Sequence, residues 1–510
     1  RLAAGLASSS SLPSSFSPAD DPDPVLMLAN PNSDPLANLI AARQSENLLE
    51  VSHAARTLLA DNPPLGARWS EVATLLNEAG DLSALLQACL KLTEAVPHDL
   101  QSWLWLASAY TQLGENRAAL KVLQPLIAAS SNDAALVRRV GRILLDLRMF
   151  PEAQTLFRSA IASNPNDVMA WEGLALSKTF TRDDDDLVSL DQLRLTSGDA
   201  LSARERGILA YALAKAYEDI GEDDIASRRV AEAAAFYRTD APFDMDQHEE
   251  GVRRILDLYD ERFAGYNFEN GLVDSRPVFL IAPPCCGAQW LTGVLAAGGD
   301  IAALPRRNSL FWMSASPLGD QTREHIMAAL SGPQAGGVLS DVAANYLRYV
   351  TELTGEVRRW IDPSSLSELA GGAMGLCLPA ARFVRIRRNP EDAAWAIFKR
   401  RFATARHWTY HPDDIARALA AHDRLVARWE TLFPDRFLTV NYEDLCQTPE
   451  EEVRRIAFFA GVDAEASVKA ALNTADRLAA SPPGIHARAG TRIEPVREAL
   501  GRAGLIAPAG

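Results

Sequence analysis

The stretch RPVFLIAPPCCGAQ, residues 276–289, decides the fold of the second half of the chain. Its apolar run, residues 277–282, has the length of a buried strand. A Pro/Cys/Gly loop follows, and helix-like residues then continue from Gln289 to Ala297. A strand, a tight loop and a helix in this order present backbone N–H groups and the positive end of a helix dipole to an anion. The stretch therefore predicts an α/β unit with an anion-binding loop after its strand.

Two further segments have the apolar character of buried strands. They are residues 382–387 (RFVRIR) and residues 436–440 (RFLTV), and helical patterns over residues 391–401 and 412–432 lie near them. Strands that alternate with helices are typical of a parallel sheet covered by helices. We therefore expect a central parallel sheet in this half of the chain.

The first half of the chain repeats itself every 34 residues. The shared features are a large residue, a small residue four later, a turn glycine and a closing proline. The small residue lets two helices approach, the glycine permits a tight turn, and the proline ends the second helix. This register resembles the tetratricopeptide repeat. The residues that carry it are Trp69, Trp103, Val137 and Trp171; Ala73, Ala107, Gly141 and Ala175; Gly80 and Gly114; and Pro63, Pro97 and Pro165.

The units differ in regularity. Residues 134–167 form the best copy, and a further unit returns at residues 207–237. Between them the acidic run of residues 183–186 and the chain to about residue 200 break the period. We interpret this interval as an irregular repeat with an acidic loop.

Composition narrows the function. The 510 residues carry a formal net charge of −15, which argues against general affinity for nucleic acid because phosphates would be repelled. Five cysteines in a chain of this size predict a reducing, cytoplasmic setting rather than a disulfide framework. No apolar run reaches the roughly 20 residues that span a bilayer. No His/Cys spacing suggests a metal site, so none is predicted.

These pieces, in this order, resemble the bacterial tetratricopeptide-repeat sulfotransferases, over roughly residues 35–475. In that family a helical solenoid precedes a P-loop-like domain that uses 3′-phosphoadenosine 5′-phosphosulfate (PAPS). The resemblance is carried by the strand and loop at residues 276–284, by ARFVRIRRNPED at residues 381–392, and by a block from Phe402 to Leu445 that contains FP at 433–434 and YEDL at 442–445.

The resemblance implies an α + α/β fold, with a tetratricopeptide-repeat solenoid followed by a P-loop-like sulfotransferase domain. The expected organisation is a disordered Ser/Pro-rich lead-in at residues 1–34, the solenoid at 35–240, a helical bridge at 241–274, the sulfotransferase-like domain at 275–480, and a flexible tail at 481–510.

The resemblance also implies where the donor binds. The positions that match the family's donor loop are Pro284, Cys285, Cys286, Gly287, Ala288 and Gln289. Arg388 matches the arginine that holds the 3′-phosphate, but the serine expected eight residues later is Ala396. The family loop reads roughly PRSGTT, so its arginine, serine and threonines are absent here. The family's Asp-Lys pair is reduced to Asp362 with Pro363, and its acidic candidate base finds no counterpart at residues 301–305.

Other side chains could supply the positive charge and the base that the matched positions lack, and each also has a purely structural interpretation. The cationic candidates either bind the donor or are solvated side chains and helix caps. His407 and His411 are either bases or surface residues. The Cys285–Cys286 pair at a helix N-terminus predicts a lowered thiol pKa; drift at an unused site is the alternative. The cationic candidates are Arg306 and Arg307, Lys399, Arg400 and Arg401, and Arg488 and Arg492.

Two functions therefore compete. The first is transfer of a sulfuryl group from PAPS to a hydroxyl of a protein or glycan acceptor recruited in the solenoid groove. The second is a catalytically inactive pseudo-sulfotransferase that acts as a protein–protein interaction scaffold. The sequence assigns no catalytic base and no oligomeric state.

Overall fold

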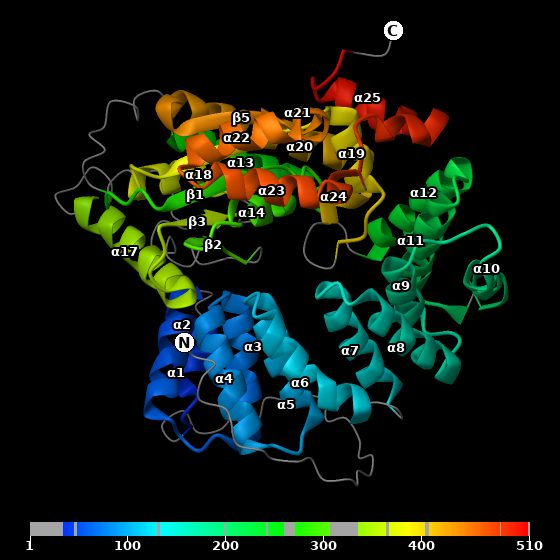
Figure 1. Ribbon diagram of the computed structural model, residues 1–510, viewed down its shortest axis with the longest axis horizontal. Helices are drawn as coiled ribbons and strands as arrows, with labels where there is room; N and C mark the ends of the chain where they lie inside the picture. Colours follow the sequence, from blue (N-terminus) through cyan, green and yellow to red (C-terminus); the bar gives the residue numbers. More distant parts are fainter. Residues whose placement is uncertain are drawn as a thin grey trace.

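The computed structural model describes residues 34–44, 48–129, 133–197, 200–240, 243–259, 271–305, 335–363, 367–402, 407–479 and 481–507. A helical half comes first in the chain and an α/β domain second, and the two lie against each other (Figure 1). Of the predicted lead-in, only residue 34 falls among the described residues.

The helical half consists largely of consecutive helices that pack in pairs (Figure 1). Its helices are α1 (Ala37–Gln44), α2 (Leu48–Asp61), α3 (Trp69–Ala79), α4 (Leu82–Ala95), α5 (Leu100–Gln112), α6 (Asn116–Ala129), α7 (Ala134–Asp146), α8 (Phe150–Ser163), α9 (Val168–Ser177), α10 (Asp185–Ser197), α11 (Ala203–Asp219) and α12 (Asp223–Asp240). The next helix, α13 (Met245–Leu258), packs with the α/β domain, against α20 (Pro412–Leu432).

The 34-residue register has a physical counterpart in these pairs. The indole of Trp103 donates to the carbonyl of Pro97 at 2.9 Å, and Trp171 donates to Pro165 at the same distance. Ala73, Ala107 and Ala175 are completely buried where two helices approach. The helical part of the predicted fold class is confirmed; that these pairs are tetratricopeptide repeats stays a prediction.

The α/β domain is built on a five-stranded parallel sheet of order β2-β3-β1-β4-β5. Its strands are β1 (Pro277–Ile281), β2 (Ile301–Ala303), β3 (Arg359–Asp362), β4 (Arg382–Arg387) and β5 (Phe437–Asn441). The predicted parallel sheet is confirmed, with β4 at the predicted bounds. Sequence reasoning missed β2 and β3, which are short and carry little apolar periodicity.

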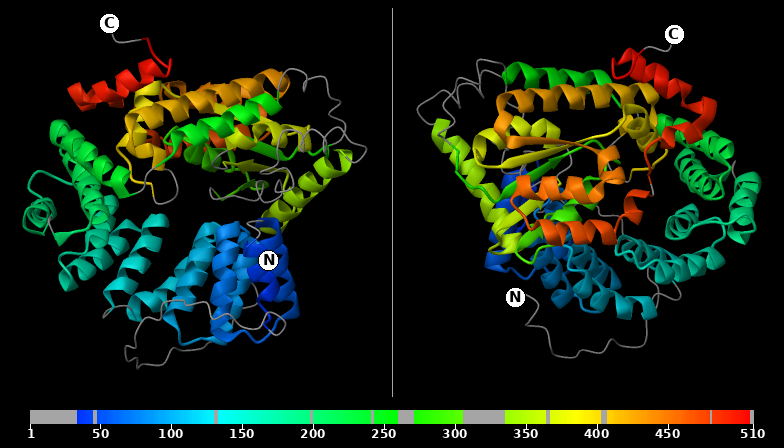
Figure 2. Two further views of the ribbon diagram at one scale, coloured as in Figure 1. Left: turned by 180° about the vertical axis from the view of Figure 1, so that it is seen from behind. Right: turned by 45° about the horizontal axis from the view of Figure 1, so that its top comes forward.

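Both faces of the sheet are covered, which explains why β1 is apolar throughout. Val278 and Leu280 belong to the core shared with α14 (Ala288–Leu295), whereas Phe279 and Ile281 belong to the core on the opposite face. Figure 2 shows the helices on the two sides. The remaining helices of the domain are α17 (Ala335–Thr354), α18 (Ser367–Cys377), α19 (Pro390–Phe398), α20 (Pro412–Leu432), α21 (Tyr442–Gln447), α22 (Pro449–Ala460), α23 (Ala464–Asn473) and α24 (Asp476–Ala479).

The expected flexible tail is wrong for most of its length. The 3-10 helix η10 (Ile485–Ile493) and α25 (Glu494–Arg502) bury Ile485, Val496 and Leu500. These helices contact α12, α19 and α20 (Figure 2). The Gly/Ala/Pro/Arg-rich composition suggested flexibility, but tertiary contacts supply the buried surface that orders the segment.

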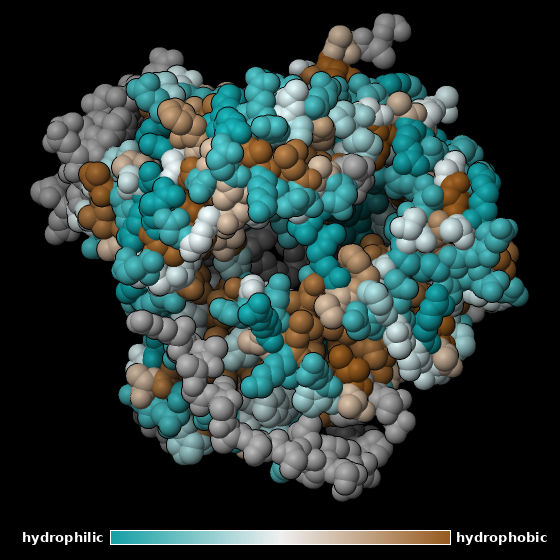
Figure 3. All heavy atoms as spheres, in the orientation of Figure 1, coloured by the Kyte–Doolittle hydropathy of each residue, from teal (hydrophilic) through white to brown (hydrophobic). Residues whose placement is uncertain are grey.

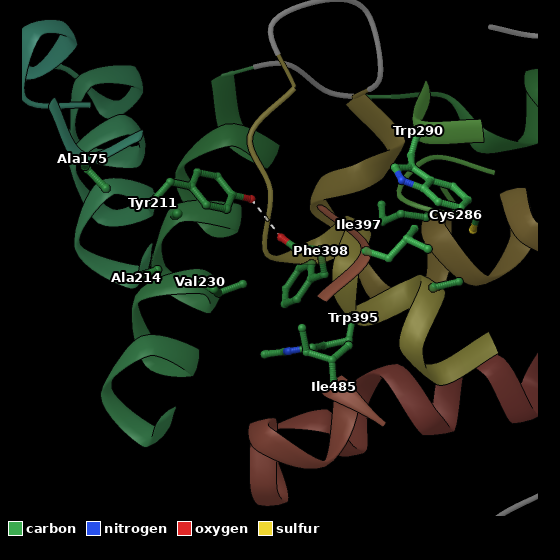
Figure 4. Close-up of a cluster of buried hydrophobic side chains, with 14 of the residues drawn as sticks. Ala175, Tyr211, Ala214, Val230, Cys286, Trp290, Trp395, Ile397, Phe398 and Ile485 are labelled. Carbon is green, nitrogen blue, oxygen red and sulfur yellow. Dashed lines mark hydrogen bonds between the residues drawn. The ribbon is translucent and has the colours of Figure 1, made fainter. Parts of the chain in front are cut away.

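The two halves meet at two separate places. At one contact, Arg56 of α2 forms an ion pair with Glu352 of α17 at 2.7 Å. At the other, the Tyr211 hydroxyl of α11 donates to the carbonyl of Phe398 at 3.2 Å (Figure 4). None of the described helices is both long and apolar enough to cross a membrane.

Candidate functional site

The site lies where the sheet topology changes direction. Strands β2 and β3 lie on one side of β1 and strands β4 and β5 on the other. In open parallel sheets, the loops at the carboxyl ends of such neighbouring strands diverge and leave a crevice for ligands. Here those loops are residues 282–287 after β1 and residues 388–389 after β4.

A cavity of about 1590 Å³ opens in front of the first loop. One wall consists of residues 282–290, residues 395–396 and 399–401, and α24. The other consists of residues from helices α7, α8, α9, α11 and α12. Figure 3 shows the molecule hollowed between the two halves. The concave side of the helices is therefore a wall of the site, not a separate groove.

The loop after β1 leads directly into α14 and lines the cavity. Gly287 is the N-cap of α14 and has φ of 83°. An added Cβ there would lie 3.0 Å from the Tyr442 ring, so both the backbone conformation and the available space favour glycine. Cys285 also takes a left-handed conformation, with φ of 63°, which is unusual for a residue with a side chain.

All six predicted loop residues line the cavity. Gln289 is exposed, Cys285 is half-buried, and Cys286 is 1% exposed. The expectation of a lowered thiol pKa is wrong for Cys286, because burial raises the pKa of that thiol well above its usual range. The helix N-terminus does not offset the loss of water around this sulfur.

Arg388 lies against the loop and is buried among protein oxygens. One terminal nitrogen donates to the Cys285 carbonyl at 2.7 Å and to the Ser481 hydroxyl at 3.1 Å. The other donates to the carbonyls of Ser481 at 3.0 Å and Pro482 at 3.4 Å. Its guanidinium also lies 4.3 Å from the centre of the Tyr442 ring. A phosphate role for Arg388 stays a prediction and would require these bonds to be exchanged.

Two of the three cations after α19 bind the helical half. Arg401 makes two hydrogen bonds of 2.5 Å with Glu172 of α9, and both side chains are almost fully buried. Lys399 donates to Glu218 of α11 at 2.6 Å. Arg400 is exposed in the cavity and forms no ion pair with any described residue.

Sequence reasoning missed further cations of the cavity, among them one on α24. Arg477 of α24 lines the cavity, is exposed, and has no ion-pair partner within the described ranges. Its neighbour Asp476 lines the cavity too, and it is likewise without an ion pair there. No motif marks these two residues, and only the folding of α24 towards the loop reveals them.

The other predicted candidates differ in where they lie and in what they bind. Arg488 and Arg492 bind Asp223 and Asp224 of α12 and so fasten η10 to the helical half. His407 and His411 are absent from the described cavity lining. Arg306 and Arg307 lie outside the described residues. Asp362 is fully buried and accepts a hydrogen bond from the Tyr346 hydroxyl at 2.7 Å.

The lining carries more basic than acidic side chains, although the chain as a whole has a net charge of −15. Such a local excess in a concave site favours an anionic ligand. Among the described residues, no group of three or more His, Cys, Asp or Glu side chains is placed to hold a metal ion.

Comparison with known proteins identifies the family of the α/β domain. Residues 277–466 match the sulfotransferase family model, so this part of the chain is a sulfotransferase-family domain. An uncharacterized protein of Aquifex aeolicus is 21% identical over 333 residues, which cover 63% of this chain and 43% of that protein. The match thus spans less than half the length of that relative.

The solved structures to which this chain is similar include bacterial sulfotransferases. The sulfotransferase of Alicyclobacillus acidocaldarius is 20% identical and covers 44% of this chain and 97% of its own, with a TM-score of 0.28. Sulfotransferase STF9 of Mycobacterium avium is 15% identical and covers 65% of this chain and 98% of its own, with a TM-score of 0.29.

Proposed function

We propose that this protein transfers a sulfuryl group from PAPS to a hydroxyl of an acceptor that binds in the cavity between the two halves. The observation that carries the proposal is the opening of residues 283–289 and the N-terminus of α14 into a cation-lined cavity. The backbone N–H groups at that helix end would bind the 5′-phosphosulfate, and Arg400 and Arg477 would add the positive charge that the loop lacks.

In the proposed reaction, the acceptor oxygen forms a bond to sulfur while the bond between sulfur and the 5′-phosphate oxygen breaks. The acceptor proton must pass to a base, and the leaving group is 3′-phosphoadenosine 5′-phosphate. Asp476 is our candidate base because its carboxylate lines the cavity without an ion pair among the described residues. The acceptor would be a protein or glycan chain thin enough to enter between the halves.

The experiment is a calorimetric titration with 3′-phosphoadenosine 5′-phosphate. We expect micromolar binding to the unaltered chain and a loss of at least tenfold in affinity for Arg400→Ala and for Arg477→Ala. Arg424→Ala is the matched control, since Arg424 is a partly exposed arginine of α20 outside the described cavity lining. The role of Asp476 as the base is then tested by comparing the unaltered chain with Asp476→Asn. The measurement is the transfer of a labelled sulfuryl group from PAPS.

A non-catalytic scaffold is the second candidate, and the Arg388 contacts favour it. All four terminal N–H groups of that arginine already have protein acceptors. No binding at millimolar nucleotide would overturn the transferase proposal and support the scaffold.

A further inference from the structure

The C-terminal segment of residues 481–486, which leads into η10, runs beside the loop after β1, residues 282–287, which we call the anion loop. Arg388 connects the two, because one of its terminal nitrogens donates both to the Cys285 carbonyl and to the Ser481 hydroxyl. A single guanidinium group therefore bridges positions almost 200 residues apart in the chain.

Tyr442 makes a second connection at the same place. Its hydroxyl donates to the carbonyls of Ser481 at 2.9 Å and Leu478 at 3.3 Å. Its ring packs on the Arg388 guanidinium and lies where a Gly287 side chain would be. The tyrosine thus contacts both the loop and the C-terminal segment.

Asp392 holds the far end of the segment. The carboxylate is 1% exposed and accepts hydrogen bonds from the backbone N–H groups of Gly484 at 2.6 Å and His486 at 3.0 Å. It also lies 2.6 Å from Nδ1 of His486. A buried carboxylate with three such contacts fixes both the position and the direction of the backbone.

The loop needs support from outside itself. A left-handed conformation at a residue other than glycine costs about 1–2 kcal/mol, and Cys285 adopts one at φ of 63°. Strained backbone of this kind persists only where surrounding contacts determine it. The bond from Arg388 to the Cys285 carbonyl acts directly on the strained residue.

We infer that residues 481–486 support the anion loop and set its conformation, with Arg388 and Asp392 as positioning residues. Arg388 binds both Ser481 and the Cys285 carbonyl, so it links the position of the segment to that of the loop. Asp392 holds the segment against α19. These contacts lie within the chain itself and do not require a bound nucleotide.

The test uses Cys286 as a reporter of loop opening. This thiol is 1% exposed, so a thiol reagent reaches it only when the loop departs from the described conformation. Mass spectrometry identifies the labelled cysteine in the full chain without ligand. We expect Asp392→Ala to label Cys286 at least tenfold faster than the unaltered chain.

Asp223→Ala is the matched control. It removes the ion pair with Arg488 of η10, yet among the described residues Asp223 forms no hydrogen bond or ion pair with the loop or with residues 481–486. Equal labelling rates in the two variants would overturn the inference. If Asp392→Ala does not fold, Asp392→Asn is compared with the unaltered chain by hydrogen exchange at the amides of residues 285–289, where unchanged exchange would also overturn the inference.

Discussion

Left-handed backbone occurs both in the helical half and in the anion loop, but different contacts support it. In the helical half, Gly80 and Gly114 take φ of 77° and 74° at turns between helices. In the loop, Gly287 takes φ of 83° against the Tyr442 ring, and Cys285 takes 63° beside Arg388. The turns of the helical half follow local chemistry, whereas the loop depends on residues distant in sequence.

Truncation of a buried side chain inside the helical half should cause the largest loss of stability. Phe157 is 1% exposed, and its ring fills the space beside Gly141 and Gly173. We expect Phe157→Ala to lower the free energy of unfolding by about 3–5 kcal/mol through lost burial and a residual cavity. Urea denaturation followed by circular dichroism measures it. Leu195→Ala, at a residue that is 72% exposed, should change stability little. A loss below about 1 kcal/mol for Phe157→Ala would contradict this packing.

The buried ion pair between the halves comes next. Glu172→Ala leaves the Arg401 guanidinium buried without its carboxylate, so we expect a loss of about 3 kcal/mol. The double variant Glu172→Ala/Arg401→Ala should lose less than the sum of the single variants, since each residue matters mainly through the other. Additive losses in thermal unfolding would show that the pair does not couple the halves.

The two kinds of glycine offer a direct comparison. Gly114→Ala meets no atom within 4 Å and should cost about 1 kcal/mol for its conformation alone. Gly287→Ala has the same conformational cost and also approaches Tyr442 at 3.0 Å, so we expect about 2 kcal/mol. Both are measured by the urea midpoint. Equal losses would mean that the Tyr442 ring moves aside freely.

The smallest expected effect is an increase in the free energy of unfolding. Cys285→Gly relieves the strain of the left-handed conformation, but glycine also gives the unfolded chain more freedom, which offsets part of this benefit. We expect a net stabilisation of about 0.5 kcal/mol. Arg148→Gly is the counterpart in the helical half, because Arg148 has φ of 61° at the repeat position of Gly80 and Gly114. Destabilisation by Cys285→Gly in thermal unfolding would show that the thiol itself supports the loop.

Much of the fold was accessible from the sequence because it follows local rules. Helix α20 has the predicted bounds, and α19 overlaps the pattern predicted at residues 391–401 but begins one residue earlier and ends three residues earlier. Caps and apolar periodicity determine such helices. The short β2 and β3 escaped prediction because tertiary pairing, not periodicity, makes them strands.

The candidate site was only partly accessible. All six predicted loop residues line the cavity, since the strand-loop-helix order is local. The partners of Arg388 were not predictable, because Ser481 and Pro482 are more than 90 residues away in the chain. Arg477 and Asp476 belong to the site only because α24 folds back to the loop.

The sequence by itself determined the 34-residue register, the parallel sheet flanked by helices, and the position of the loop after β1. Helix pairs and strand-loop-helix units depend on neighbouring residues, so local patterns reveal them. Only the tertiary structure decided that the helices wall the cavity, that Arg388 binds the C-terminal segment, and that Cys286 is buried with a raised pKa. These features depend on burial and on contacts between distant segments, which local patterns do not encode.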